Sequence, residues 1–233
     1  MKTRLLLCAA LCALATGPAG AASMHTLVFT SSGTFTIPAT AVAGTEFEFT
    51  VIAGGGGGGG CYNTSFVAAG GGSGGAGMAS FSGFAPSQAV TITVGAGGTA
   101  GVSGSNGGSG SQSRVKVSGV NVVTTIGGRG SVGESSGTGG GNTAGTFTAT
   151  AGTSGLTLAS SLDYAAQDGL NYAETTSLPP LGYAIPGGGN PLGHMGTLTN
   201  YDGALGGGAL GCQSKAEPGG TGGAGVVIVR WAL

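Results

Sequence analysis

The chain has 233 residues, of which 55 are glycine, 40% are hydrophobic and 6% are charged. Disorder goes with low hydrophobicity and high charge, so this composition favours a folded chain whose backbones pack closely. Glycine does not recur at every third position, and this irregular spacing excludes a collagen triple helix.

The first 21 residues are typical of a secretory signal. Lys2 and Arg4 precede an apolar run at 5–14, and Ala19-Gly20-Ala21 matches a cleavage site. The run is too short to span a bilayer, and no later segment is long enough, so we predict a chain that is not membrane-spanning. Cys8 and Cys12 leave a lipoprotein open as the alternative. We expect a bacterial protein that is secreted, at the cell surface or in the periplasm.

Removal of this signal leaves residues 22–233, which we predict to form a single glycine-rich β domain. Its five basic and eight acidic residues give a net charge of −3. The basic residues do not cluster densely along the sequence, so we expect no nucleic-acid partner.

Several short stretches predict strands because β-branched and aromatic residues alternate with polar ones. In the stretch 45–53, apolar residues from Phe47 to Val51 alternate with Glu46 and Glu48, which we interpret as a solvated face rather than a catalytic pair. The predicted strands are 26–30, 34–37, 45–53, 89–94, 114–117, 120–126 and 226–231. The pair 114–117 and 120–126 reads as a hairpin, and 226–231 is expected to pair inside the sheet formed by the N-terminal strands.

Glycine runs follow these strands, and the run at 54–60 is seven consecutive glycines. Such a run has no side chain to bury, so an ordered run must pack backbone against backbone. The conformation that suits this packing is polyproline II, whose N–H and C=O groups all point outward to neighbours. We predict a mainly β or irregular fold, in which a small antiparallel β-sandwich joins a packed sandwich of glycine-rich polyproline-II rods, with almost no helix. The termini should lie at one end and the loops at the other.

Two cysteines remain after the signal, Cys61 and Cys212, and each follows a glycine-rich approach. An exported chain with two cysteines favours a disulfide, here capping two neighbouring rods. Free thiols, or a link between two protomers, remain the alternatives.

Glycine thins out at about 146–205, which we predict to be a loop-rich insertion. It contains four of the five tyrosines, Tyr164, Tyr172, Tyr183 and Tyr201, together with several prolines that rule out a long helix. This composition is typical of binding loops, in which tyrosine supplies contact area and Ser, Gly and Asn supply hydrogen bonds. The alternative is that these tyrosines cover the rods.

Four pieces of the chain carry a family resemblance: Phe29–Pro38, Phe47–Gly60, Val90–Gly98 and Gly222–Trp231. Together, in this order, they resemble the glycine-rich domain of phage tail-fibre tip adhesins, of bacterial exported glycine-rich proteins and of mosaic trimeric adhesins. The resemblance implies polyproline-II rods packed as a sandwich, with variable loops that contact a surface receptor or glycan. The loops would correspond here to 62–67, 81–84 and 156–205. It also raises a homotrimer, or docking on a fibre, as an expectation.

The sequence thus predicts an exported adhesin-like module that binds a cell-surface glycan or an outer-membrane receptor through aromatic loops. The predicted contact residues are Tyr62, Phe66, Tyr164, Tyr172, Tyr183, His194 and Tyr201. The alternative is a structural or matrix protein that self-assembles through its rods without a specific ligand. Ice binding is a weaker third hypothesis, because the rods are uneven.

We find no sequence signal for an enzyme. Gly71-Gly72-Ser73-Gly74-Gly75 matches the nucleophile-elbow pattern, but no strand and helix flank it as that motif requires. His25 and His194 lie far apart in the chain, so we expect no metal site, and no motif indicates a cofactor.

Overall fold

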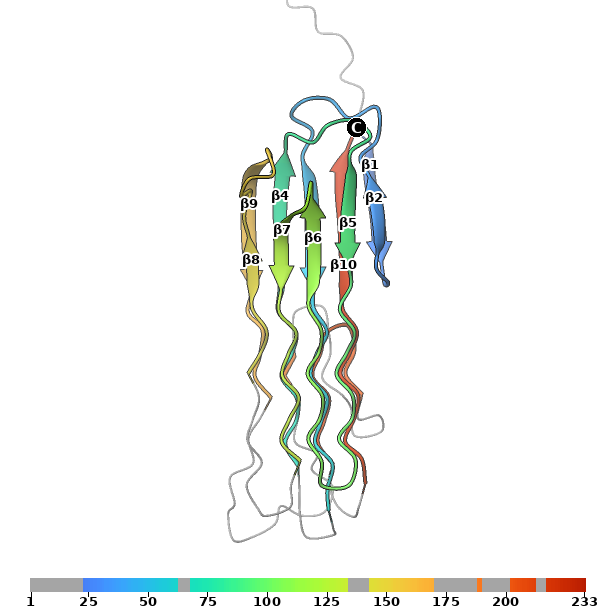
Figure 1. Ribbon diagram of the computed structural model, residues 1–233, viewed down its shortest axis with the longest axis vertical. Helices are drawn as coiled ribbons and strands as arrows, with labels where there is room; N and C mark the ends of the chain where they lie inside the picture. The colour runs from blue at the N-terminus through green and yellow to red at the C-terminus, as the bar shows by residue number, and fades with distance from the viewer. Residues whose placement is uncertain (1–22, 63–67, 134–142, 170–187, 190–201, 213–216) are drawn as a thin grey trace, which may run out of the picture.

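The computed structural model describes residues 23–62, 68–133, 143–169, 188–189, 202–212 and 217–233. In these residues the chain forms ten strands, arranged as two five-stranded antiparallel sheets, and no helix. The sheets face each other at one end of an elongated molecule, and glycine-rich segments continue from the strands toward the other end (Figure 1). The predicted mainly β fold with glycine rods is therefore confirmed.

We call the first sheet the terminal sheet, because it contains the first and the last described strand. Its order is β1 (Met24–Phe29), β10 (Val226–Ala232), β3 (Phe47–Ile52), β4 (Ala76–Ser82) and β9 (Thr157–Tyr164). Strand β10 pairs with β1 on one side and β3 on the other, as predicted. The N–H of Ser23 donates to the carbonyl oxygen of Leu233 at 2.9 Å, so the two described ends lie together.

We call the second sheet the basic sheet, because its strand β6 (Ser113–Val117) carries Arg114 and Lys116. It runs β2 (Gly33–Thr36), β5 (Ala89–Thr93), β6, β7 (Val120–Thr125) and β8 (Phe147–Ala149). The predicted hairpin is confirmed in β6 and β7. Its two-residue turn, Ser118-Gly119, has φ values of 49° and 85°, which suit the twist of a tight hairpin.

The core lies between the two sheets. Phe47, Phe49 and Val51 point inward from β3 and are fully buried, as their alternation predicts. Phe81 and Phe84 pack against Phe49, and the centroids of the rings are 6.3 and 6.1 Å from that of Phe49. This apolar cluster fixes the strands, and therefore the positions from which the glycine segments start.

Three strands were not predicted. The resemblance implies a loop at 81–84, but 76–82 is strand β4, and Phe81 and Phe84 are core residues rather than loop contacts. The sequence analysis places a loop-rich insertion at about 146–205, but 147–149 and 157–164 are strands β8 and β9. Small residues at the start of strand β4 hide its pattern: a Cβ at Gly77 would overlap the ring of Phe147, so that position admits no side chain.

The glycine segments are ordered rods, and their hydrogen bonds repeat every three residues. Along rod 53–61, every third N–H donates to the same neighbour, which is rod 68–75, rod 105–112 or rod 217–225. Gly57, for example, donates to the carbonyl oxygen of Gly108 at 2.9 Å. Three residues per turn, with the backbone groups pointing outward, is the geometry of polyproline II.

The carbonyl oxygens of rod 53–61 are satisfied in the same way by three further rods. They accept N–H groups from rods 95–101, 126–133 and 203–212, again with a repeat of three residues. The six described neighbours also hydrogen-bond to one another in a closed ring around the central rod. All nine residues of rod 53–61 are consequently buried although they carry almost no side chains.

Rod 68–75 is enclosed in a similar way. Its hydrogen-bond partners are rods 53–61, 126–133 and 203–212 and the shorter segments 143–146, 165–169 and 188–189. A polyproline-II rod with six backbone neighbours is possible only because glycine lets the backbones approach each other. The two enclosed rods, 53–61 and 68–75, therefore form the backbone core of the distal half.

We predict that the amides of the enclosed rods exchange slowly. Residues 54–60 and 71–75 donate to carbonyls inside the lattice, so exchange requires local separation of the rods. Relative to the turn amides of Ser103 and Gly104, we expect exchange to be slowed about 1,000-fold or more, as an opening free energy near 5 kcal/mol implies. Amide hydrogen exchange of the protein measures this ratio, and equal rates would contradict an ordered lattice.

Candidate functional site

The rods end on the side opposite to the two described ends of the chain, Ser23 and Leu233, and we call this end the rod tip (Figure 1). Tyr62 directly follows the central rod and is 61% exposed, and Val102 in the turn after rod 95–101 is 63% exposed. The backbone below them is held tightly. Gly60 donates its N–H to Ser105, and the side-chain oxygen of Asn106 accepts the N–H of Gly133 at 2.7 Å. The rod tip thus presents exposed apolar side chains on a rigid base.

A disulfide joins Cys61 to Cys212 at this tip, with the Cα atoms 5.7 Å apart. Both cysteines are buried, and Ala68 packs against them. They end rods 53–61 and 203–212, which are hydrogen-bonded neighbours, so the predicted pairing and its position are confirmed. The bond immediately precedes Tyr62 and therefore fixes the backbone from which that side chain projects.

Of the predicted contact residues, two are described. Tyr62 lies at the rod tip as expected, whereas Tyr164 lies on β9, half-buried against Ile52, Ala76 and Val226. Tyr164 thus covers the junction of strand and rod, which is the alternative that the sequence analysis left open for these tyrosines. The remaining five predicted contacts lie outside the described residues: Phe66, Tyr172, Tyr183, His194 and Tyr201.

Two further sequence motifs now have structural explanations. The Ser73 hydroxyl of the nucleophile-elbow match is fully buried in an enclosed rod, where it donates to the carbonyl oxygen of Gln167 at 3.0 Å. Glu48 forms an ion pair with Arg230 on the neighbouring strand, with 3.0 Å between carboxylate oxygen and guanidinium nitrogen. Both side chains therefore have structural contacts, and Glu46 is exposed as a solvated face would be.

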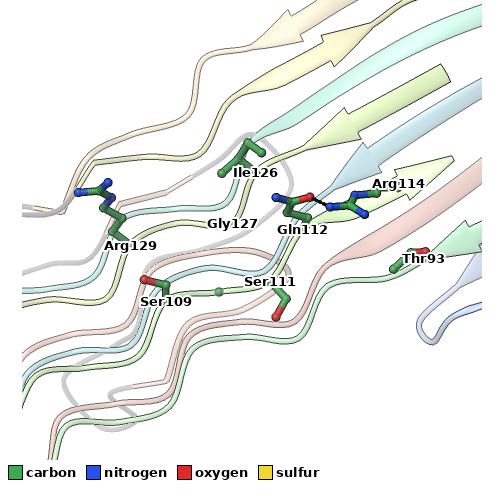
Figure 2. Close-up of a pocket in the computed structure, with 9 residues that line it drawn as sticks. Thr93, Ser109, Ser111, Gln112, Arg114, Ile126, Gly127 and Arg129 are labelled. Carbon is green, nitrogen blue, oxygen red and sulfur yellow. Dashed lines mark hydrogen bonds between the residues drawn. The ribbon is translucent and has the colours of Figure 1, made fainter. Parts of the chain in front are cut away.

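A second surface, which no sequence pattern predicts, lies on the side of the second sheet. An open groove of about 540 Å³ lies where the basic sheet meets its rods, as Figure 2 shows. It combines two arginines, hydroxyls, an amide and one exposed aliphatic side chain from strands β5 and β6 and rods 105–112 and 126–133. The lining residues are Thr93, Ser109, Gly110, Ser111, Gln112, Arg114, Ile126, Gly127 and Arg129.

A comparison with protein-family models matches the glycine-rich domain over residues 30–232. The chain belongs to this glycine-rich domain family. The match covers every strand except β1, which ends at Phe29, and it includes the described rods and the disulfide. No curated protein matches the chain. Across the described residues, no helix is long and apolar enough to cross a membrane.

Proposed function

We propose that the chain is an exported adhesin-like recognition module, which binds a cell-surface glycan or an envelope receptor with side chains carried at the rod tip. The observation that supports this proposal best is the position of Tyr62. It is exposed and directly follows the disulfide that joins the ends of rods 53–61 and 203–212. The resemblance to phage tail-fibre tips and exported bacterial adhesins, whose loops bind surface receptors, is consistent with this use of the tip.

Rigidity gives the tip an energetic advantage in binding. Each side chain or loop that must be ordered on binding costs free energy, and a platform already fixed in the unbound protein avoids part of that cost. Tyrosine combines a large apolar ring with a hydroxyl and loses little entropy when it is held. Its ring can stack on the apolar face of a sugar, while neighbouring polar groups bond the hydroxyls.

We expect Tyr62→Ala to weaken binding to target cells about tenfold, which corresponds to about 1.4 kcal/mol. Binding of the labelled protein to cells or to a glycan array measures the change. Met24→Ala is the control, because Met24 is also exposed, at 69%, but lies on β1 at the opposite end. Equal losses in the two variants, or none in Tyr62→Ala, would remove the tip from the proposal.

The other proposed contacts are tested as a group, because they lie outside the described residues. Alanine at Tyr172, Tyr183, His194 and Tyr201, with Phe66 changed in a second step, should reduce binding further while circular dichroism stays unchanged. A folded variant that binds like the parent would show that these side chains do not contact the ligand.

The alternative of a self-assembling matrix protein is less well supported. The backbone donors of the two enclosed rods find their acceptors within the same chain, so these rods offer no free lattice to a second molecule. Light scattering of the secreted protein distinguishes the two functions. Open-ended polymers would favour the matrix function, whereas a monomer, or a closed trimer docked on a fibre, fits the adhesin-like one.

A further inference from the structure

The net negative charge of the mature chain conceals two faces of opposite sign. The basic sheet and its rod extensions, 94–112, 126–133 and 143–146, contain Arg114, Lys116 and Arg129 and no Asp or Glu. The described acidic residues belong by chain position to the terminal sheet, its flanking segment or the other rods: Glu46, Glu48, Asp163, Asp168, Asp202 and Glu217. Asp168 comes nearest to the basic face, because its carboxylate accepts the N–H of Ala144 at 2.6 Å, whereas none of the six lines the groove. The fourth described basic residue, Arg230, is on that sheet and is paired with Glu48.

The two arginines of the basic face lie toward opposite ends of the groove in Figure 2, with Ile126 and Gln112 between them. Arg114 is half-buried and donates to the side-chain oxygen of Gln112, whereas Arg129 is exposed. Neither forms an ion pair with a described residue. Arg114 pairs with Thr124 across the hairpin, five residues before Arg129, so the two positions are about 15 Å apart along the rod axis.

We propose that this groove binds an acidic oligosaccharide, a chain of sugars that carry carboxylate or sulfate groups. A guanidinium group forms paired, charge-assisted hydrogen bonds with such anions, and the two arginines would each hold one acidic group. The hydroxyls of Ser109 and Ser111 and the amide of Gln112 lie between them, where they can bond sugar hydroxyls. An extended polymer fits because the groove runs along straight rods.

The lining favours a saccharide over a nucleic acid. Single-stranded nucleic acids are held by aromatic side chains that stack on bases together with many basic contacts to phosphate. None of the nine lining residues is aromatic, and two are basic. The site is separate from the rod tip, so it stands independently of the function proposed for Tyr62.

The experiment measures binding of the full secreted protein to an oligogalacturonate and to a neutral galactose oligomer of equal length, by calorimetry at low and physiological salt. We expect binding of the acidic oligomer alone, and weaker binding as salt screens the two contacts. Arg129→Gln should weaken it about tenfold, Arg129→Lys less, and Arg114→Gln with Arg129→Gln should abolish it. Arg230→Gln is the matched control, because it removes one arginine from the terminal sheet and should change nothing.

Four results would overturn the proposal: no binding of the acidic oligomer, equal binding of the neutral one, an equal loss in Arg230→Gln, or tighter binding of an oligothymidylate of similar charge. Arg129 is exposed on a rod, so its replacement leaves the fold intact even where Arg114→Gln does not. The single variant therefore decides the question by itself if the double variant is unstable.

Discussion

Replacement of Gly57 by alanine is expected to lower the free energy of unfolding by at least about 3 kcal/mol. Gly57 is the centre of the enclosed rod, and a Cβ built there would lie 2.7 Å from the carbonyl carbon of Thr99. This contact is with backbone, so no side-chain rotation relieves it. The rods would have to separate, which weakens the bonds from Gly57 to Gly108 and from Ser131 to Gly57, each 2.9 Å long. Urea denaturation followed by the fluorescence of Trp231 measures the loss.

Gly33→Ala is the control for this prediction. A Cβ at Gly33 would meet the ring of Phe29 at 3.5 Å, which is ordinary contact, and its φ is not positive. We expect its unfolding free energy to change by less than about 1 kcal/mol. If Gly57→Ala unfolds at the same urea concentration as Gly33→Ala, a Cβ fits between the rods, and the proposed close packing of their backbones is contradicted.

The alternation of apolar and polar residues is the signal that predicts most of the strands. Phe47 and Phe49 point to the core and Glu48 to the surface, and this pattern predicts a strand at 45–53, where β3 lies. Strand β9 gives no such pattern because it is an edge strand with exposed residues on both faces. Its strand conformation comes from pairing with β4, a long-range contact that no local pattern reports.

The sequence predicts that glycine rods pack against one another, but it does not predict which rods are neighbours. Inside rod 53–61 every residue is small, so nothing in its sequence reports which N–H faces which neighbour. The rods on the surface do carry a signal: in rod 126–133 the exposed residues are Ile126, Arg129 and Val132, three residues apart. This repeat of three is the side-chain counterpart of the hydrogen-bond repeat, and it marks polyproline II at the edge of the lattice.

The basic groove was missed for a different reason. Arg114 and Arg129 are separated in the sequence by a hairpin, and the chain as a whole is acidic, so neither composition nor spacing indicates a basic surface. The charges separate only after the chain is divided between two sheets. The tip, in contrast, was predicted in part, because the glycine run before Cys61 already placed Tyr62 at the end of a rod.

Removal of the disulfide is expected to lower the free energy of unfolding by about 4–5 kcal/mol. Cys61 and Cys212 are 151 residues apart in the sequence, and a bond that closes so long a loop restricts the unfolded chain strongly in the chain-entropy model. The double variant Cys61→Ala with Cys212→Ala keeps small apolar side chains beside Ala68, so it removes the bond with little change in packing. Urea denaturation of the variant and of the parent, both without reductant, measures the difference.

The same variant tests whether the bond supports the tip as well as the fold. Because Tyr62 follows Cys61 directly, loss of the bond should free its backbone and weaken the proposed cell binding even where the sheets remain folded. Met24→Ala in the same double-cysteine background serves as the reference for the far end of the molecule. A double variant as stable as the parent would mean that the hydrogen bonds between rods 53–61 and 203–212 already restrict the chain as much as the disulfide does. Unchanged binding in that variant would show that the disulfide is not needed for binding and contributes to stability alone.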